Sequence, residues 1–379
     1  MSADDDNGFG VYLHWPYCAA ICPYCDFNVY KERDIDAARW RAALGADLRH
    51  WAARTKGRKL TSLYFGGGTP SLAPLIVIEG VIAACEELWG FAPDPEITLE
   101  ANPTDAELSR FADFARAGVN RLSLGVQSFN DAALSFLGRH HDGRTAERGL
   151  DRALASFPRV TLDLIYALPE QSLADWSGEL KKAIASGAGH LSLYQLTIEK
   201  ETAFVRAVKR GAWRPADEEI AADLFDATQE ITASAGLPAY EISNHARRGE
   251  ASRHNLLYWR GADYVGVGPG AHGRVTLDAK THAVETHRRP EAYLESVETS
   301  GCGASLDDPL TDEERLTERL AMGLRLSEGL LLTAQDHRLL AARLDALCAD
   351  GLLIKDGARI TATPAGRRLL NHLLAQLVA

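Results

Sequence analysis

The 379-residue chain is poor in cysteine and has no long apolar run. Six cysteines are too few for a disulfide framework in a chain of this length. No stretch reaches the roughly 18 apolar residues of a membrane-spanning helix, and residues 1–7 have neither the basic nor the apolar region of a secretory signal. The sequence therefore predicts a cytoplasmic protein and leaves peripheral membrane contact open.

Basic residues are also in the minority, with 41 Lys and Arg against 52 Asp and Glu, which gives a formal net charge of −11. A nucleic-acid partner is therefore not expected, because nucleic acids are polyanions. The basic pairs Arg247-Arg248 and Arg288-Arg289 are too short to form an extended binding stripe. A hydrophobic share of 46% and a charged share of 25% predict an ordinary globular protein.

Short apolar runs alternate with longer stretches of helical period from residue 9 to about residue 235. This alternation predicts an α/β fold with a parallel sheet. Strands are expected over residues 10–15, 60–65, 96–101, 120–126, 160–166 and 190–197. Helices are expected over residues 36–54, 75–89, 104–117, 145–155 and 173–185. Because six βα units are too few for a complete eight-stranded barrel, the sequence predicts a partial (β/α)6 barrel over residues 1–235.

Two further regions follow the predicted barrel. Residues 236–305 are rich in Gly, His and Arg, and we expect them to form a cap or linker. Residues 306–379 contain two helical runs, an alternating segment with Asp356-Gly357 at its centre, and a last helix after Pro364. Because Asp-Gly between alternating segments favours a hairpin, this order predicts a small winged-helix-like α+β domain. DNA binding stays an alternative for such a domain, although its last helices are not notably basic.

Three cysteines lie within eight residues, directly after the first expected strand: Cys18, Cys22 and Cys25. Soft thiolates select zinc, copper(I) or iron-sulfur groups. Structural zinc normally needs four protein ligands, and His14 could complete a Cys3His site, so zinc is one interpretation. Spacings of three and two residues also suit a compact iron-sulfur cube whose fourth iron is left open.

Polar residues and glycines stand at the ends of the other expected strands. Gly66-Gly67-Gly68-Thr69-Pro70 follows the second strand, where bare backbone can approach a ligand closely. Glu100 ends the third strand, Gln127 and Ser128 end the fourth, and Asp163 lies on the fifth. We expect these groups to converge on the same rim as the cysteines. The alternative is that inward-pointing polar residues only bond one another.

The Cys-x3-Cys-x2-Cys spacing, with an aromatic residue before the last cysteine, resembles the signature of the radical S-adenosylmethionine (SAM) family. The resemblance implies a [4Fe-4S] cluster on Cys18, Cys22 and Cys25, whose open iron chelates SAM. In this family, an electron from the reduced cluster cleaves SAM and yields a 5′-deoxyadenosyl radical. The cofactor supplies this chemistry, and the protein supplies position and electrostatics.

The motifs resemble more narrowly the branch of the oxygen-independent coproporphyrinogen III oxidases, and the match covers nearly the whole chain. It implies SAM contacts from Tyr12, Gly67, Gly68, Thr69, Glu100, Gln127, Arg139 and Asp163. One departure is Ala167, where the family usually has glycine before Leu168-Pro169, and its methyl group could crowd the adenosyl site.

Two functions compete within this branch. One is the oxidase, which decarboxylates two propionates of coproporphyrinogen III. The other is a haem chaperone of the HemW type, which delivers haem to apo-haemoproteins. Phe27 stands where the oxidase has a fourth cysteine, and few residues precede Cys18, whereas the oxidase has an N-terminal arm there. Both features favour the chaperone. A radical enzyme with another substrate is a third reading.

The segment from His254 to Trp259 resembles the haem-binding motif of the HemW family. His254 and Tyr258 share a face if the segment is helical, with Trp259 adjacent. The resemblance implies an imidazole that ligates haem iron beside an aromatic wall. The alternative is that His254 is a hydrogen-bonded histidine packed at the barrel mouth. His272 is a weaker candidate for a second ligand.

Overall fold

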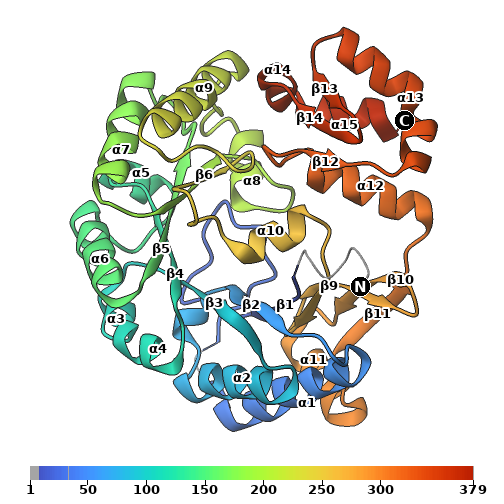
Figure 1. The fold of residues 1–379 in the computed structure, drawn as a ribbon. Coiled ribbons are helices and arrows are strands. Elements are labelled where there is room, and N and C mark those ends of the chain that lie inside the picture. The colour runs from blue at the N-terminus through green and yellow to red at the C-terminus, as the bar shows by residue number, and fades with distance from the viewer. Residues whose placement is uncertain (1–7, 33, 379) are drawn as a thin grey trace.

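The computed structural model describes residues 8–32 and 34–378, and its centre is a curved sheet of eleven strands (Figure 1). Neighbouring strands in the middle of the sheet run parallel and alternate with helices along the chain. They are β1 (Gly10–Trp15), β2 (Leu60–Gly67), β3 (Phe91–Ala101), β4 (Arg121–Gln127), β5 (Arg159–Tyr166) and β6 (His190–Gln195). These strands confirm the predicted partial (β/α)6 barrel.

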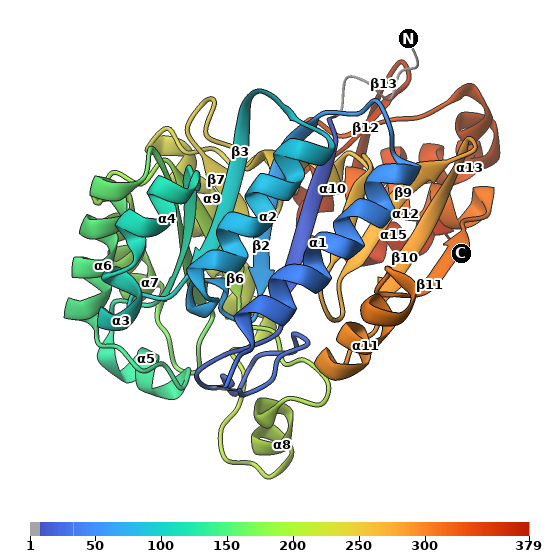
Figure 2. The same ribbon diagram turned by 90° about the horizontal axis from the view of Figure 1, so that it is seen from below.

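Helices cover the outer face of the sheet (Figures 1 and 2). They include α1 (Ala37–Arg54), α2 (Leu75–Leu88), α3 (Asp105–Leu108), α4 (Phe111–Ala117), α6 (Gly143–Ser156), α7 (Leu173–Ala185) and α9 (Glu218–Ser234). The helix predicted over residues 104–117 is divided into α3 and α4. The break falls at Arg110, whose guanidinium donates hydrogen bonds to the carbonyl oxygens of Ser71 and Ala73.

Each parallel strand has an apolar outer face and a largely polar inner face. In β1, the Trp15 indole packs on Trp40 of α1 with ring centroids 5.4 Å apart, whereas Tyr12 points inward toward Tyr64 of β2. Apolar residues such as Leu13 are fully buried between sheet and helices. Because successive side chains in a strand point to opposite faces, burying the apolar set directs the polar set into the barrel interior.

Residues 236–305, which we expected to form a cap or linker, contribute strands that extend the sheet at its two ends. β7 (Asn244–Ala246) pairs antiparallel with β6, and β8 (Tyr264–Val267) pairs parallel with β1. From β8 the sheet continues through β9 (His272–Leu277), β10 (Lys280–Thr286) and β11 (Ala304–Pro309). The physical reason is that an unpaired edge of β1 would leave backbone N–H and C=O groups without partners.

The remaining elements are short segments around the sheet. They comprise η1 (Pro70–Leu72), α5 (Asp131–Phe136), α8 (Ala203–Lys209), α10 (Arg253–Trp259) and α11 (Pro290–Ser300). Within residues 8–32 and 34–378, no helix has both the length and the apolar character needed to cross a membrane. The prediction about a secretory signal concerned residues 1–7, which lie outside the described residues.

The C-terminal domain has the predicted order of helices around a hairpin. Its elements are α12 (Asp312–Gly323), β12 (Leu330–Leu331), α13 (Ala334–Ala349), β13 (Leu353–Asp356), β14 (Arg359–Ala362), α14 (Pro364–Arg368) and α15 (Leu370–Val378). β13 and β14 pair antiparallel across the Asp356-Gly357 turn, where Gly357 has a φ of 56°. Leu320, Leu344 and Ile360 belong to a hydrophobic cluster separate from that of the barrel.

The effect of alanine at position 167 is on the backbone conformation and not on the cavity. Its φ is 57°, in the left-handed region that glycine adopts freely and alanine adopts at a cost of about 1–2 kcal/mol. The residue is buried after β5, and its side chain is absent from the lining of the main cavity among the described residues. The methyl group of Ala167 therefore does not crowd the cavity as we expected, and its consequence is local backbone strain.

We expect Ala167→Gly to raise the free energy of unfolding by about 0.5–1 kcal/mol, because glycine relieves the left-handed strain but gains entropy in the unfolded chain. Denaturant unfolding measures the change. The matched control is Ala222→Gly within α9, which should lower the same quantity by about 1 kcal/mol. An equal loss of stability in both variants would contradict the strain at Ala167.

Candidate cofactor site at the carboxyl ends of the strands

The loop after β1 carries the three predicted ligands at the carboxyl edge of the sheet (Figure 2). Two backbone hydrogen bonds close the base of this loop, from Cys18 N to Tyr30 O at 2.9 Å and from Tyr30 N to Pro16 O at 2.8 Å. Cys25 N donates to Cys22 O at 3.1 Å, which makes a tight turn between the last two ligands. All three thiols are free and partly exposed.

A small apolar cluster supports the loop from below. Phe204 of α8 donates its backbone N–H to Pro23 O at 3.0 Å, and its side chain packs in a cluster with Leu137 and Ile165. Pro23 also lies against Gly138, where an added Cβ would come within 2.7 Å of Pro23 Cδ. The ligands therefore stand on a packed base, and α8 lies at this same edge of the molecule (Figure 2).

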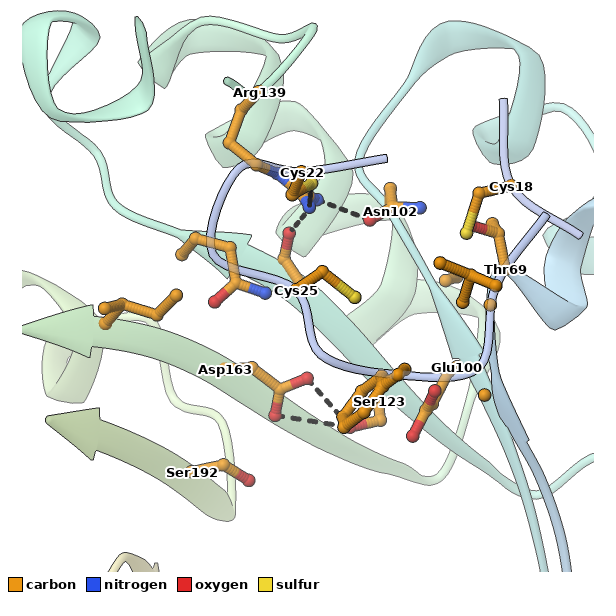
Figure 3. Close-up of a pocket in the computed structure, with 18 of the residues that line it drawn as sticks. Cys18, Cys22, Cys25, Thr69, Glu100, Asn102, Ser123, Arg139, Asp163 and Ser192 are labelled. Carbon is orange, nitrogen blue, oxygen red and sulfur yellow. Dashed lines mark hydrogen bonds between the residues drawn. The ribbon is translucent and has the colours of Figure 1, made fainter. Parts of the chain in front are cut away.

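The surroundings of the thiols disfavour the free thiolates. Burial raises the pKa of Cys18 above its usual value and that of Cys25 to about 11. Thr69 Oγ1 donates to Cys18 Sγ at 3.4 Å, and Arg139 Nη1 lies 3.5 Å from Cys22 Sγ (Figure 3). Because thiolates are the ligating form, bound iron would have to supply the positive charge that stabilises them.

A cavity of about 600 Å³ opens beside the cysteines. It is lined by Cys18, Cys22, Cys25, Gly67, Gly68, Thr69, Glu100, Gln127, Arg139 and Asp163, together with neighbouring residues from β2 to β6. The three predicted cluster ligands and all but one of the predicted SAM contacts thus line one cavity. Within residues 8–32 and 34–378, however, the three thiols are not gathered closely enough to form a metal-binding group (Figure 3). A volume of this size is typical of sites for small organic ligands.

The exception is Tyr12, which lies behind the cavity wall. Its hydroxyl is 3.0 Å from His14 Nδ1, and its ring is within 2.9 Å of the position of a Cβ added to Gly66. His14 Nε2 is in turn 2.9 Å from Asn28 O. Both ring nitrogens of His14 are therefore engaged away from the cysteines, which removes the basis for the alternative Cys3His zinc site.

The glycine loop after β2 forms a cradle of bare backbone. A Cβ added to Gly68 would lie 2.7 Å from Tyr17 O and 2.9 Å from Trp15 O, so no side chain fits there. Gly67 has a φ of 102°, and its added Cβ would meet the His14 ring at 2.7 Å. These contacts explain why the sequence has glycine here, and they leave the backbone open to the cavity.

Two carboxyl groups face one another across the interior. Tyr64 OH donates to Glu100 Oε1 at 2.8 Å. Ser123 Oγ donates to the two carboxylate oxygens of Asp163 at 3.0 and 3.3 Å (Figure 3). Burial raises the pKa of Glu100 to about 8 and that of Asp163 to about 7, because their hydrogen bonds only partly offset the desolvation. A cationic group in the cavity would favour both charged forms.

Unpaired buried polar atoms mark where a polar ligand fits. Gln127 has a φ of 69° at the bulged end of β4, and its Oε1 is buried without a hydrogen-bond partner. Arg139 Nε is also buried and unpaired, although its Nη2 donates to Asn102 Oδ1 and to Gly125 O. Because buried polar groups are normally paired, these atoms are available to a polar ligand in the cavity.

The predicted haem motif lies on α10 beneath the same cavity, which Asn255 helps to line. His254 of α10 is 1% exposed, with Nδ1 2.8 Å from Ser62 Oγ and Nε2 2.7 Å from Tyr258 OH. Its ring stacks on Tyr64 at 5.0 Å, and Trp259 lies under the Arg325 guanidinium of the C-terminal domain at 4.7 Å. In this conformation both ring nitrogens of His254 are engaged and the ring is buried, so haem ligation by His254 stays a prediction. His272 is exposed on β9, 3.7 Å from Glu285.

Several residues of the site escaped the sequence analysis. Tyr64, Ser123, Ser192 and Tyr194 all line the cavity. Strand alternation could have found Ser123, because it lies two residues before Gly125 and four before Gln127 on the same strand. Tyr64 precedes the glycine loop by two residues, and the same alternation applies to it.

The comparisons with known proteins agree with this geometry. Residues 12–183 match the radical SAM superfamily and residues 310–369 match the HemN C-terminal domain. The chain is 35% identical to "Heme chaperone HemW" of Escherichia coli (strain K12), over 97% of this chain and 98% of that protein. It is 38% identical to "Radical S-adenosyl methionine domain-containing protein 1, mitochondrial" of Bos taurus, over 97% of this chain and 87% of that protein.

A solved structure shows the same architecture. The coproporphyrinogen III oxidase HemN from Escherichia coli superposes with a TM-score of 0.81 over 98% of this chain and 90% of that one, at 22% identity. This likeness concerns the fold alone. Fold, domain order and cysteine rim together define a radical SAM protein with a HemN-type C-terminal domain. The chain belongs to the HemW haem chaperone family within that class.

We expect the wild type to lose stability as pH rises toward 8, and we expect Glu100→Gln to remove this loss. The pKa of Glu100 in the folded protein, about 8, exceeds the value of about 4.3 expected in the unfolded chain. The folded state therefore binds the proton more tightly, and the stabilisation that this provides is lost as pH rises toward 8. Between pH 6 and 8, the free energy of unfolding should fall by about 1–2 kcal/mol less in the variant than in the wild type.

Denaturant unfolding without SAM measures this difference. Glu79→Gln, at an exposed position on α2, is the matched control and should follow the wild type. If Glu100→Gln loses as much stability over this pH range as the wild type, the pKa of Glu100 is not raised in the folded protein.

Replacing any one of Cys18, Cys22 and Cys25 by alanine should abolish the brown absorbance of anaerobically reconstituted protein, because each thiolate would hold one iron. Cys302→Ala should retain about four irons and four sulfides per chain. Cys85→Ala should retain them too but unfold more easily, because Cys85 is fully buried in the barrel core. If a variant with all three cysteines replaced by alanine still binds the full amount of iron, these cysteines are not the cluster ligands.

Proposed function

We propose that this chain is a haem chaperone, which binds haem and passes it to apo-haemoproteins, and that it holds a [4Fe-4S] cluster and SAM. The observation that carries the cofactor part is that one cavity is lined by the three cysteines, the glycine loop and the strand-end polar groups. The haem part is supported by relatives that are named haem chaperones and match along nearly their whole length.

The residues of the cavity suit the chemistry of these groups. When bound, the cluster would supply the electron that cleaves SAM. Glu100, once its carboxyl is ionised, would accept hydrogen bonds from the SAM ammonium group, and the bare backbone of Gly67 and Gly68 would leave room for its amino-acid moiety. Arg139 places a guanidinium beside Cys22, which balances part of the negative charge that three thiolates bring.

The oxidase is the competing function within this fold. Phe27 stands where the oxidase has its fourth cysteine, and the ring is 61% exposed beside the ligating loop. A hydrocarbon side chain there cannot ligate iron or carry a thiol reaction. This difference favours binding and transfer of a porphyrin over its decarboxylation.

Two assays on the cluster-loaded protein test the function. Under anaerobic conditions with SAM and a reductant, coproporphyrinogen III should remain unconverted. Haem bound to the protein should pass to an apo-haemoprotein such as apomyoglobin, followed by the absorbance of the recipient, faster than haem bound to serum albumin. Multiple turnovers to protoporphyrinogen IX would establish the oxidase instead, and a protein that retains no haem would refute the chaperone.

A further inference from the structure

His254 is buried in this structure, and the mouth of the cavity offers a different, accessible surface for haem. We propose that haem binds at this mouth, with His140 as the ligand of its iron and with Ile21 and Phe27 against one face of the macrocycle. This inference rests on the proposed haem-binding function and names the site at which that function operates.

Two exposed apolar side chains stand on the ligating loop. Ile21 is 46% exposed and Phe27 is 61% exposed, and both line the cavity. Other exposed apolar residues of the barrel, such as Ile76 and Ile220, lie on the outer helices α2 and α9. Single apolar residues on helices need no explanation, but a pair at the mouth of a ligand cavity favours an apolar ligand.

His140 presents a free imidazole at the same mouth. Its neighbours turn inward, since Arg139 donates to Gly125 O at 2.9 Å and His141 Nε2 lies 3.1 Å from Val126 O. His140 itself is exposed and lines the cavity. Within residues 8–32 and 34–378, no hydrogen bond or ion pair occupies its ring. An unoccupied imidazole is a common axial ligand of haem iron.

The loop that carries His140 is fixed against the ligating loop. Arg139 Nη1 lies 3.5 Å from Cys22 Sγ, and Gly138 packs against Pro23. Ile21 precedes Cys22 in the chain, so the apolar side chain and the imidazole stand on adjoining loops of one opening. A planar macrocycle at this opening could contact both loops at once.

Two exposed arginines are joined through the backbone to the ligating loop. Asn28 Nδ2 donates to Arg288 O at 2.7 Å, and Tyr30 OH donates to the same carbonyl oxygen at 3.2 Å. These bonds hold the exposed Arg288-Arg289 pair beside the ligating loop. Haem carries two propionates at one edge, so two cations next to an apolar platform complement both parts of the molecule.

A haem titration of the cluster-loaded protein tests the site, with the Soret band as the readout. His140→Ala should shift the Soret band and weaken haem binding at least tenfold, because the iron loses its axial ligand. Phe27→Ser should weaken binding without moving the band. Added imidazole should restore the band position in His140→Gly, which a merely structural effect would not do.

Two matched histidine variants serve as controls. His372→Ala removes an exposed imidazole from α15 of the C-terminal domain, and it should titrate like the wild type. His254→Phe keeps the buried ring but removes both ring nitrogens, and its Soret band should also be unchanged. SAM binding and far-ultraviolet circular dichroism confirm that each variant is folded.

The outcomes separate this site from the proposed function. A wild type that retains no haem refutes the haem chaperone itself. A wild type that binds haem while His140→Ala gives the same band and the same affinity refutes the rim site and leaves the function intact. A Soret shift in His254→Phe alone would assign the iron to α10 and overturn His140 as ligand.

Discussion

Parallel strands of a partial barrel end at one edge, and every group of the candidate site depends on that convergence. Cys18 follows β1, Gly67 ends β2, Glu100 lies on β3 and Gln127 ends β4. Chain segments more than a hundred residues apart thus enclose one cavity. Because the outer face of each strand is occupied by apolar packing, the inner face is free to carry polar side chains, and chemistry can gather there without loss of the core.

The opposite end of the barrel is closed by a buried ion pair. Arg121 Nε donates to Glu96 Oε2 at 2.9 Å, and the two side chains are 1% and 0% exposed. Glu96 Oε1 also accepts the backbone N–H groups of Arg253 at 2.8 Å and His254 at 3.2 Å, at the first turn of α10. A carboxylate at a helix N-terminus is favourable, so one buried charge fixes α10 beneath the cavity.

The site combines two acids whose pKa values are raised with polar atoms that have no hydrogen-bond partner. Glu100 and Asp163 are half-buried acids with raised pKa values, and Gln127 and Arg139 have buried atoms without partners. Burying such groups costs free energy, and a ligand that carries both an ammonium and hydroxyl groups can offset part of this cost by pairing with them. Burial also raises the pKa of the Cys18 and Cys25 thiols, so their thiolates need a bound cation such as iron for stabilisation.

The sequence by itself determined the six parallel strands, the hairpin at Asp356-Gly357 and the three-cysteine loop, because periodicity, turn residues and ligand spacing are local properties. Only the tertiary structure decided that β8 completes the edge of β1, that His254 is sealed between Ser62 and Tyr258, and that His140 stands at the cavity mouth. These facts depend on which distant segments pair and on which side chains burial leaves accessible, and no local pattern encodes either.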